Sequence, residues 1–566
     1  MLNLIQNAKL EINNILLKAY EKAAEQGTLP ADAVLNGTVE IPKDVTNGDF
    51  AANHAMAGAK ALHMAPRAIA EALIANAELE GTWFASCEVA GPGFINFRLN
   101  PSWYSDVLKT VEEEDESYGC IDVGAGKKLM VEFVSANPTG PMHMGNARGG
   151  VLGDALAEVL SRAGYDVSRE FYVNDAGNQI DKFAQSIEAR YIQLIRGEDA
   201  VEFPEDGYQG DDIKDLAKAF YDEYGDKFLD KDPAERRAFM GEFGLNVNIP
   251  RMKEDLERYG IHYDRWFMES SLHASGYVKA TCDRLTELGY TYEKDGALWL
   301  KTTELVKNCE KDDVLRRANG FYTYFAADIA YHRNKLEVRG YDIAINIWGA
   351  DHHGHVARLK GALDALGLDG EHRLSVVLMQ LVKLMSNGQE VRMSKRTGKM
   401  ISLENLLDDI PVDAARYFFN SRPESPVIFD LELAKREDSE NPVYYVQYAH
   451  ARICTMIANL AAEGFNVPKA EDASLELLST DEEKELIRSL AKLPDCVRTC
   501  ASDFDPSHVN AYVTDLATKF HKFYTVCRIK GEEENLLLAR LFLADKTRVV
   551  LENALSIIGV SAPEKM

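Results

Sequence analysis

The sequence predicts an α/β protein built on a Rossmann-type, doubly wound parallel sheet, with an α+β domain before it and an all-α domain after it. The first observation is an apolar strand pattern, residues 129–134, which a turn joins to a long amphipathic helix. The second is strand–helix–strand alternation between residues 341 and 384, typical of parallel sheets. The third is helical periodicity from about residue 413 onward. Together they predict three regions: 1–115, 120–410 and 411–566.

The first region is expected to begin with a helix and end with a strand. Apolar side chains recur at helical intervals from Leu4 through Ile12 to Tyr20. Residues 93–99 alternate apolar and polar side chains, as a half-buried strand does. The run 119–128, with its glycines and lysines, is typical of a linker.

In the central region, the helix after the first strand is expected to stop at Gly164. Strands are predicted over 341–348 and 374–384, with a helix over 355–366 between them. The interval of about 178–312 is charged and helical in pattern, so we expect an insertion rather than part of the sheet. In the last region, helices are predicted over 482–493, 508–524 and 533–557, which indicates a bundle.

Composition excludes several classes of protein. The 566 residues correspond to about three to five domains. No stretch reaches the roughly 18 uncharged apolar residues of a membrane span, and the N-terminus has no secretory-leader pattern, so we expect a cytoplasmic protein. Eight cysteines without a C-x-x-C pair argue against disulfides and structural zinc. The formal charge of −27 argues against non-specific nucleic-acid binding, but it permits selective docking on a local basic face.

The turn after the first central strand carries the most informative motif, His143-Met144-Gly145-Asn146-Ala147-Arg148-Gly149-Gly150. Small residues at this helix start leave backbone N–H groups accessible, and the helix dipole favours a phosphate there. His143 could donate to a phosphate oxygen. The alternative is a helix packed tightly on the sheet, with a histidine that only caps it.

A second motif, Arg392-Met393-Ser394-Lys395-Arg396-Thr397-Gly398-Lys399, follows a predicted turn. Several cations on a small loop suit a polyphosphate, although an isolated basic loop is usually only a solvated surface. The two motifs, about 250 residues apart, form a specific pair. That pair resembles the HIGH and KMSKS motifs of class I aminoacyl-tRNA synthetases.

Within this class the chain resembles the arginyl-tRNA synthetases. The matching segments follow the family order and cover nearly the whole chain: residues 132–140, 172–179, 348–353, 413–418 and 441–452. The resemblance implies activation of arginine with ATP and Mg²⁺, release of pyrophosphate and esterification of tRNA(Arg). It also implies a C-terminal anticodon-binding domain, N-terminal contacts with the tRNA elbow, and a monomer.

The resemblance also implies residue roles. His143, Asn146 and Lys395 would be catalytic, Lys395 by stabilising charge in the transition state. ATP contacts would come from His143, Gly145, Asn146, Gly349, Asp351, His352, Met393, Ser394 and Lys395. Asn146 replaces the last histidine of HIGH, while Arg392 and Arg396 replace the first lysine and final serine of KMSKS. Because charge is kept in the loop, we expect activity to survive.

The resemblance assigns arginine binding to Glu132, Ser135, Asn137, His143, Tyr324 and Asp328. Tyr324 and Asp328 are spaced i, i+4 and so share one face of a predicted helix; without the resemblance they would suggest an ordinary amphipathic face. Glu132 stands in an apolar strand, where an unpaired charge would be costly. We therefore favour a functional role for it.

Two further groups have competing interpretations. Asp351-His352-His353 could suggest a metal, but no cysteine or acid with ligand spacing is near, so we expect no metal site and assign the segment to adenosine. Basic and aromatic residues of the last region would contact tRNA, although some of the aromatics there belong to the core. The predicted tRNA contacts are Tyr444, Tyr448, Arg452, Lys519, Lys522 and Arg528.

Two alternatives to an arginine–tRNA ligase remain at this point. One is a class I synthetase for another amino acid, which would need a different pocket at Glu132, Tyr324 and Asp328. The other is a non-catalytic protein descended from a synthetase, which Asn146 favours and the retention of His143 and Lys395 opposes.

Overall fold

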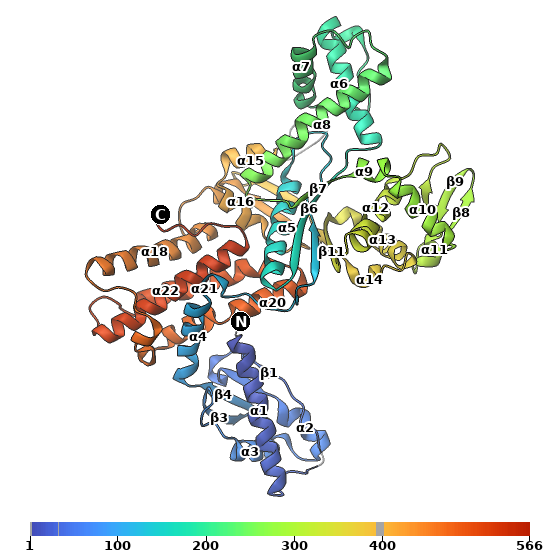
Figure 1. Ribbon diagram of the computed structural model, residues 1–566. Helices are drawn as coiled ribbons and strands as arrows, with labels where there is room; N and C mark the ends of the chain where they lie inside the picture. The colour runs from blue at the N-terminus through green and yellow to red at the C-terminus, as the bar shows by residue number, and fades with distance from the viewer. Residues whose placement is uncertain (1–2, 32, 392–400) are drawn as a thin grey trace.

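The computed structural model describes residues 3–31, 33–391 and 401–566. Figure 1 shows an elongated molecule, with the N-terminal domain at one end, a helical projection at the other and the central sheet between them. The fold class expected from the sequence is confirmed: a parallel sheet with helices, an N-terminal domain and a C-terminal helical domain. No helix in the described ranges is both long and apolar enough to cross a bilayer.

The N-terminal domain packs three helices on an antiparallel sheet of strand order β1-β2-β4-β3. The expected amphipathic helix is α1, which buries Leu4, Ile12 and Tyr20, and the expected strand is β4. A fourth helix, α4, leads on toward the rest of the chain (Figure 1). The elements are α1 (Leu4–Glu25), β1 (Val39–Glu40), β2 (Phe50–Ala52), α2 (His54–Leu62), α3 (Pro66–Asn76), β3 (Phe84–Ala90), β4 (Phe94–Leu99) and α4 (Pro101–Glu114).

The central sheet has five parallel strands in the order β12-β11-β5-β6-β7. The chain enters at β5 in the middle, builds outward through β6 and β7, and returns to the other side of β5 with β11 and β12. The strand order therefore reverses between β5 and β11, where open α/β sheets usually bind ligands. The elements are β5 (Lys128–Glu132), α5 (Met144–Arg162), β6 (Asp166–Val173), β7 (Arg265–Met268), α12 (Tyr324–Arg333), β11 (Ile343–Gly349), α13 (His353–Ala365), α14 (Gly370–Arg373) and β12 (Leu374–Met379).

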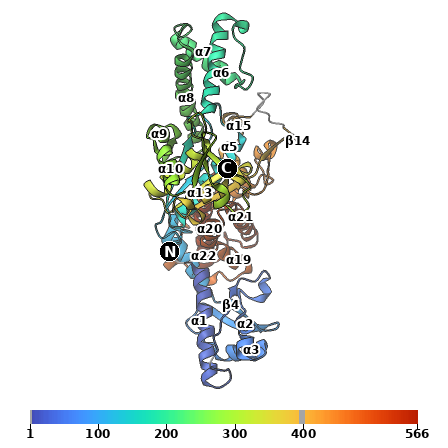
Figure 2. The same ribbon diagram turned by 90° about the vertical axis from the view of Figure 1, so that its right-hand side faces the viewer.

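The interval 178–312 differs from the expected helical insertion. Its first part is helical and projects from the sheet in both ribbon views (Figures 1 and 2), but β7 then pairs in parallel with β6 as an edge strand. A separate antiparallel sheet of order β10-β9-β8 follows. Strands of four residues are too short to show an alternation in the sequence. The elements are α6 (Asn178–Arg196), α7 (Asp211–Tyr224), α8 (Pro233–Arg258), α9 (Glu269–Ala274), α10 (Tyr277–Glu287), β8 (Thr291–Lys294), β9 (Ala297–Leu300), α11 (Thr302–Leu305) and β10 (Asp313–Arg316).

The last region is mainly helical, with one departure from the expected all-α pattern. Strand β15 pairs in parallel with β13, which pairs in turn with β14. The short Val427–Asp430 run lies between turns and was hidden by the helical periodicity around it. The elements are β13 (Val382–Ser386), β14 (Gln389–Glu390), α15 (Leu403–Asp409), α16 (Val412–Phe419), β15 (Val427–Asp430), α17 (Leu431–Ala434), α18 (Pro442–Ala462), α19 (Asp481–Leu490), α20 (Leu493–Asp503), α21 (His508–Val526) and α22 (Glu534–Ile557).

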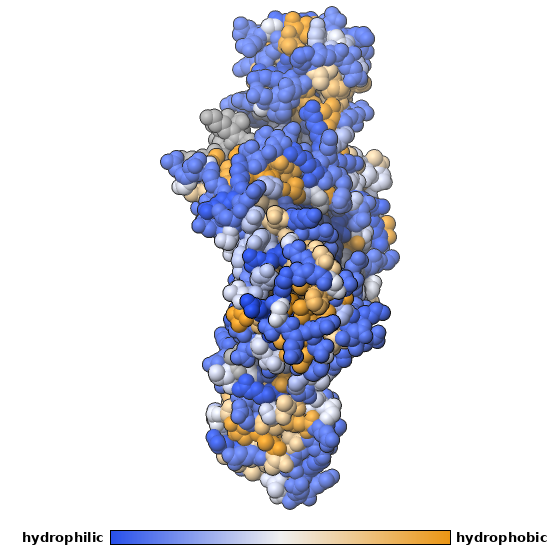
Figure 3. Space-filling view, turned by 90° about the vertical axis from the view of Figure 1, so that its left-hand side faces the viewer, coloured by the Kyte–Doolittle hydropathy of each residue, from blue (hydrophilic) through white to orange (hydrophobic). Residues whose placement is uncertain are grey.

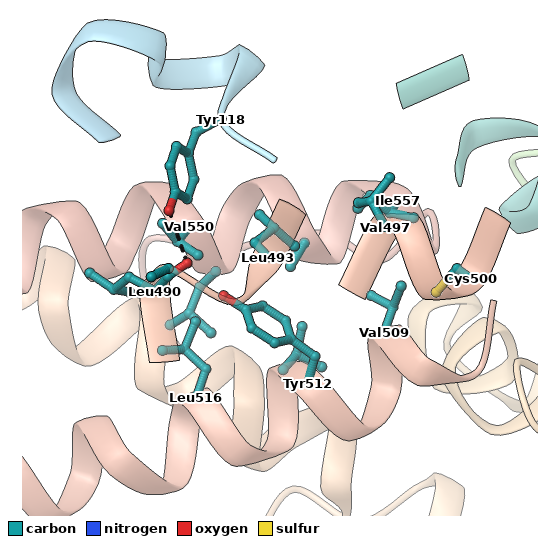
Figure 4. Packing of buried hydrophobic residues seen from close by; sticks show 14 of the residues in the cluster. Tyr118, Leu490, Leu493, Val497, Cys500, Val509, Tyr512, Leu516, Val550 and Ile557 are labelled. Carbon is teal, nitrogen blue, oxygen red and sulfur yellow. Dashed lines mark hydrogen bonds between the residues drawn. The ribbon is translucent and has the colours of Figure 1, made fainter. Parts of the chain in front are cut away.

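Apolar side chains from several helices fill the core of this helical region (Figure 4). Tyr118, from the segment after α4, inserts into the same core and donates a hydrogen bond to the Leu490 carbonyl at 3.1 Å. The outer surface shows only small apolar patches on the face seen in Figure 3. The N-terminal and helical domains are therefore joined by packing as well as by the chain.

Arg416 of α16 joins three parts of the molecule. It is buried, and its guanidinium donates to the carbonyls of Tyr259 and Ile558, which follow α8 and α22. It also forms an ion pair with Asp154 of α5 at 2.5 Å. Gly559 permits this approach, because a Cβ there would lie 2.1 Å from the guanidinium.

Candidate active site and nucleic-acid interface

The carboxyl ends of β5 and β11 bring together predicted residues from distant parts of the chain. Glu132 is the last residue of β5, and Gly349 is the last residue of β11. The two strands pair in parallel, with Asn346 opposite Glu132. His143 caps the helix that follows β5. These residues therefore lie along the edge where the strand order reverses.

His143 and Asn146 form a reciprocal cap at the start of α5. The Gly145 N–H donates to His143 Nδ1 at 3.1 Å, and the His143 N–H donates to the Asn146 side-chain oxygen at 3.0 Å. Because Nδ1 accepts, a neutral His143 ring carries its proton on Nε2, the form that can donate to a phosphate oxygen. The amide of Asn146 performs this capping without a charge.

The glycines of α5 serve packing as well as access. A Cβ at Gly153 would lie 2.1 Å from the ring of Phe133, the residue after β5, and one at Gly150 would lie 2.7 Å from Ile261. Among the described residues, a Cβ at Gly145 would meet only the His143 ring. The first turn of α5 is therefore accessible, and later turns of the same helix pack tightly on the sheet. The two interpretations of the motif, phosphate binding and tight packing, are compatible.

The predicted loop residues Met393, Ser394 and Lys395 lie outside the described residues. The chain resumes beside the HIGH-like turn: Ser402 forms a β-bridge with His143, and the Leu403 N–H donates to the Met142 carbonyl at 2.9 Å. The C-terminal boundary of the basic segment is thus next to the helix start.

On the β11 side, Gly349, Asp351 and His352 lie where the strand passes into α13. Asp351 and His352 are exposed, with 83% and 56% of their side chains accessible. Within the described parts of the chain, no three His, Cys, Asp or Glu side chains gather to hold a metal.

Tyr324 and Asp328 occupy successive turns of α12, so the predicted shared face is present. Asp328 lies between two histidines: Oδ1 is 3.0 Å from Nδ1 of His332, and Oδ2 is 2.6 Å from Nε2 of His355. Burial opposes ionisation of Asp328, but the charges and hydrogen bonds of both histidines outweigh it and hold the pKa of its carboxyl well below the ordinary value.

Glu269, which sequence reasoning missed, belongs to the same group of carboxylates. It is 4% exposed at the start of α9, and burial raises its pKa despite contacts with Tyr172 and His273. Tyr172 also feels the charges of Glu269 and Asp328, which add to the burial that raises its pKa. Glu269 follows the aromatic strand β7 just as Glu132 ends β5, and this similarity was the available signal.

Both oxygens of Glu132 contact the protein. Oε1 accepts from Ser135 Oγ at 2.9 Å, and Oε2 pairs with the fully buried Lys335 at 2.5 Å. Asn137 is exposed at the turn beyond Ser135. The predicted arginine-binding residues therefore form two groups: a cation-paired group at β5 and a histidine-paired group at α12.

In the helical domain, a hollow of about 1140 Å³ brings together three of the predicted tRNA contacts, Tyr448, Arg452 and Arg528. The Arg452 guanidinium lies between the rings of Tyr448 and Tyr524, 4.7 and 4.9 Å from their centroids. It also donates to Tyr448 Oη at 3.0 Å. A cation between two aromatic rings provides both charge and a stacking surface.

The other predicted tRNA contacts are placed differently. Tyr444 stacks near-parallel to Tyr448 with centroids 6.2 Å apart, and it lines a neighbouring hollow of about 400 Å³. Lys519 pairs with Asp515 at 2.6 Å, and Lys522 pairs with Glu485 at 3.3 Å. Neither lysine lines the larger hollow, whereas Tyr524, Lys530 and Met566 do.

Comparison with known proteins agrees along the whole chain. Residues 9–99 match the arginyl tRNA synthetase N-terminal domain, 108–422 the class I (R) tRNA synthetase catalytic domain, and 446–566 the DALR anticodon binding domain. Arginine–tRNA ligases of Caldanaerobacter subterraneus and Acetivibrio thermocellus are 54% and 53% identical, over 100% of both chains.

The fold of the solved Thermus thermophilus arginyl-tRNA synthetase also matches, with a TM-score of 0.72 at 20% identity. That likeness covers 97% of this chain and 99% of the other. Fold, site and full-length similarity thus agree: the chain belongs to the arginyl-tRNA synthetase family of class I.

Proposed function

We propose that the protein is an arginine–tRNA ligase. It joins L-arginine to ATP as arginyl-adenylate, releases pyrophosphate, and transfers the arginine to the 3′ end of tRNA(Arg). The observation that carries this proposal is a pair of carboxylates, the partly exposed Asp328 and the buried Glu269, whose ion-pair partners among the described residues are histidines only. Such a pair is suited to a cationic substrate.

Arginine recognition follows from how charge is distributed. Glu132 and Glu170 are each paired with a lysine or arginine, whereas Asp328 and Glu269 have no such partner in the part of the chain that the structure describes. A guanidinium is planar, always charged and has five N–H donors, which suits two carboxylates and a phenol better than an ammonium would. We assign the side chain of arginine to Asp328, Glu269 and Tyr324. Ser135, Asn137 and His143 are assigned to its α-amino and carboxylate groups.

Phosphate binding is assigned to the start of α5, where His143 and the backbone of Gly145 lie. Lys395 is assigned to the charge that develops as pyrophosphate leaves. Gly349, Asp351 and His352 are assigned to adenosine. Since the described residues offer no cluster of three metal ligands, Mg²⁺ is proposed to arrive bound to the ATP phosphates, where it would offset their charge.

The larger hollow of the helical domain is proposed to bind unpaired bases of the tRNA. Tyr448, Tyr524 and Arg452 supply stacking surfaces, and Arg452 and Arg528 have no carboxylate within ion-pair distance in the described chain. The enzyme is proposed to act as a cytoplasmic monomer, which sedimentation with and without tRNA would test.

Pyrophosphate–ATP exchange with each amino acid, with and without tRNA, tests the proposal. Exchange with arginine and no other amino acid is the expected result. Exchange with a different amino acid would keep the class I chemistry and contradict the pocket assignment. No exchange under any condition, from folded protein that still binds tRNA, would identify a non-catalytic relative.

A further inference from the structure

Three buried polar residues cross the central sheet in one row. Asn346 on β11, Glu132 on β5 and Glu170 on β6 lie opposite one another in register, and they are 0%, 5% and 1% exposed. Their neighbours in these strands are largely apolar. Because a buried charge costs several kcal/mol unless it is paired, both carboxylates need a cation from another element.

The short segment after α12 supplies both cations. Residues Asn334–Val338 form a π-helical turn, a widened turn that is frequent at functional sites. Lys335 Nζ lies 2.5 Å from Glu132 Oε2 and 3.1 Å from Asn346 Oδ1. Arg339 pairs with Glu170 through both terminal nitrogens. The two ion pairs are neighbours, but among the described residues only the contacts of Lys335 continue to Ser135 and His332, at the candidate arginine site.

From Lys335, one branch reaches the turn after β5. Glu132 accepts from Ser135 Oγ at 2.9 Å, and that oxygen accepts from the Tyr172 N–H at 3.1 Å. Val134 and Ser135 have φ values of 67° and 43°, in the left-handed region that a β-branched residue rarely enters. Such a conformation persists only where its surroundings enforce it. Here Glu132 contributes that restraint, at the turn that carries Asn137.

The second branch reaches the other end of the site. Asn346 Nδ2 lies 2.7 Å from His332 Nε2, which Lys335 also approaches at 3.5 Å. Since two donors face Nε2, a neutral His332 accepts there and carries its proton on Nδ1, which lies 2.9 Å from the main-chain carbonyl and 3.0 Å from the carboxylate Oδ1 of Asp328. The buried ammonium of Lys335 is therefore connected by hydrogen bonds to both groups of candidate arginine-binding residues, through Glu132 and through His332.

We propose that Lys335 is a positioning residue for arginine. It neutralises Glu132, so that Glu132 can hold the strained turn at Val134 and Ser135, and it fixes His332, which orients Asp328. The inference rests on the proposed function. It adds that Glu132, because Lys335 neutralises it, does not bind the guanidinium of arginine. Asp328 and Glu269, which have only histidine partners among the described residues, bind it.

The test replaces Lys335 with methionine (K335M) in the full-length enzyme and measures KM for arginine and for ATP in pyrophosphate exchange with tRNA present. We expect the arginine KM to rise about 10- to 100-fold, the usual effect of removing an outer partner of a binding group, and the ATP KM to change less than threefold. Arg339→Met is the matched control, because it breaks the neighbouring buried ion pair, in which Glu170 also accepts from the Tyr331 hydroxyl, and leaves the contacts of Glu132 and His332 in place. Thermal unfolding of both variants is measured alongside.

A wild-type arginine KM in K335M would overturn the proposal, as would an equal rise in R339M. If K335M does not fold, His332→Gln interrupts the second branch without leaving an unpaired buried charge. A three- to tenfold rise in the arginine KM of that variant supports the proposal, and an unchanged value overturns it. Failure of the proposed function is a separate result, since the wild-type protein itself would then show no arginine-dependent exchange.

Discussion

The candidate arginine site and the larger hollow of the helical domain carry charges of opposite sign that have no partner of fixed opposite charge among the described residues. In the arginine site, Asp328 and Glu269 lack a lysine or arginine partner among the described residues, and in the hollow Arg452 and Arg528 lack a carboxylate. Nearby groups of the same types are neutralised within the protein: Glu132 by Lys335, and Lys519 by Asp515. The comparison teaches that pairing, rather than residue type or burial, separates groups available to a ligand from groups that hold the fold.

Asp328→Asn should have the largest effect, because it removes one of the two carboxylates assigned to arginine. Removing one partner of a largely desolvated, hydrogen-bonded charge pair costs about 2–5 kcal/mol, so kcat/KM for arginine should fall by about 30-fold to several thousandfold. The ATP KM should change little. Binding of citrulline, the uncharged analogue of arginine, should be nearly unaffected. A loss below threefold for arginine would show that Asp328 does not face the guanidinium.

The hollow can be tested with a matched pair of cations. Arg452→Ala removes an unneutralised cation and its stacking surface, and the tRNA Kd should rise about tenfold or more, since such contacts are worth about 1–3 kcal/mol. Lys519→Ala removes a cation already paired with Asp515 and should change the Kd less than twofold. Filter binding at two salt concentrations measures both. Equal effects of the two substitutions would contradict the pairing rule.

Glu269 makes arginine binding depend on pH. Burial raises the pKa of its carboxyl above the ordinary value, and only the ionised form attracts a guanidinium. Arginine affinity should therefore rise with pH until Glu269 is ionised, by at most about tenfold per pH unit below its pKa. The groups that face Glu269 are His273 and Tyr172, with Asp175 nearby. Calorimetry at pH 5 to 8 should give a flatter profile for Glu269→Gln, and a parallel profile would assign the dependence to another group.

Asp255 on α8 is a carboxylate outside both sites, without an ion-pair partner among the described residues, and its charge should affect only the free energy of unfolding. Burial and the charge of Glu404 raise the pKa of Asp255 to about 6, so the folded state is destabilised progressively as the pH rises from the ordinary carboxyl pKa to about 6, and by a constant amount above it. The shift corresponds to about 3 kcal/mol, which solvent screening of this half-buried group reduces to about 1 kcal/mol. Asp255→Asn should raise the unfolding temperature at pH 8 but not at pH 4. A rise at both pH values would point to a contact rather than a charge.

Local patterns predicted the elements that depend on neighbours in the chain. The amphipathic α1, the His143 turn and the i, i+4 pair Tyr324 and Asp328 all follow from spacing within a few residues. The same reasoning missed β7 and β15, because four residues give no measurable alternation and their pairing partners lie far away in the chain.

The missed parts of the site depend on long-range contacts. Lys335 is 203 residues from Glu132, and nothing in the sequence joins them. The role of Glu269 depends on β7 joining the sheet, so missing the strand meant missing the residue. In contrast, Asp515 is four residues before Lys519, so that ion pair was visible from spacing. The role of Lys519 in tRNA binding stays a prediction, which its pairing with Asp515 makes less favourable.

The ion pair between Arg416 and Asp154 fixes one point of α5, about which the helix could tilt. Asp154 lies eleven residues beyond His143, which is about 16 Å along the helix axis. A tilt of α5 by about 4° around that point would displace His143 by about 1 Å, enough to change a rate about a hundredfold. Because Arg416 also donates to the carbonyl of Ile558 after the last helix, a displacement of the helical domain would be passed to α5 and so to His143, the group proposed to bind ATP.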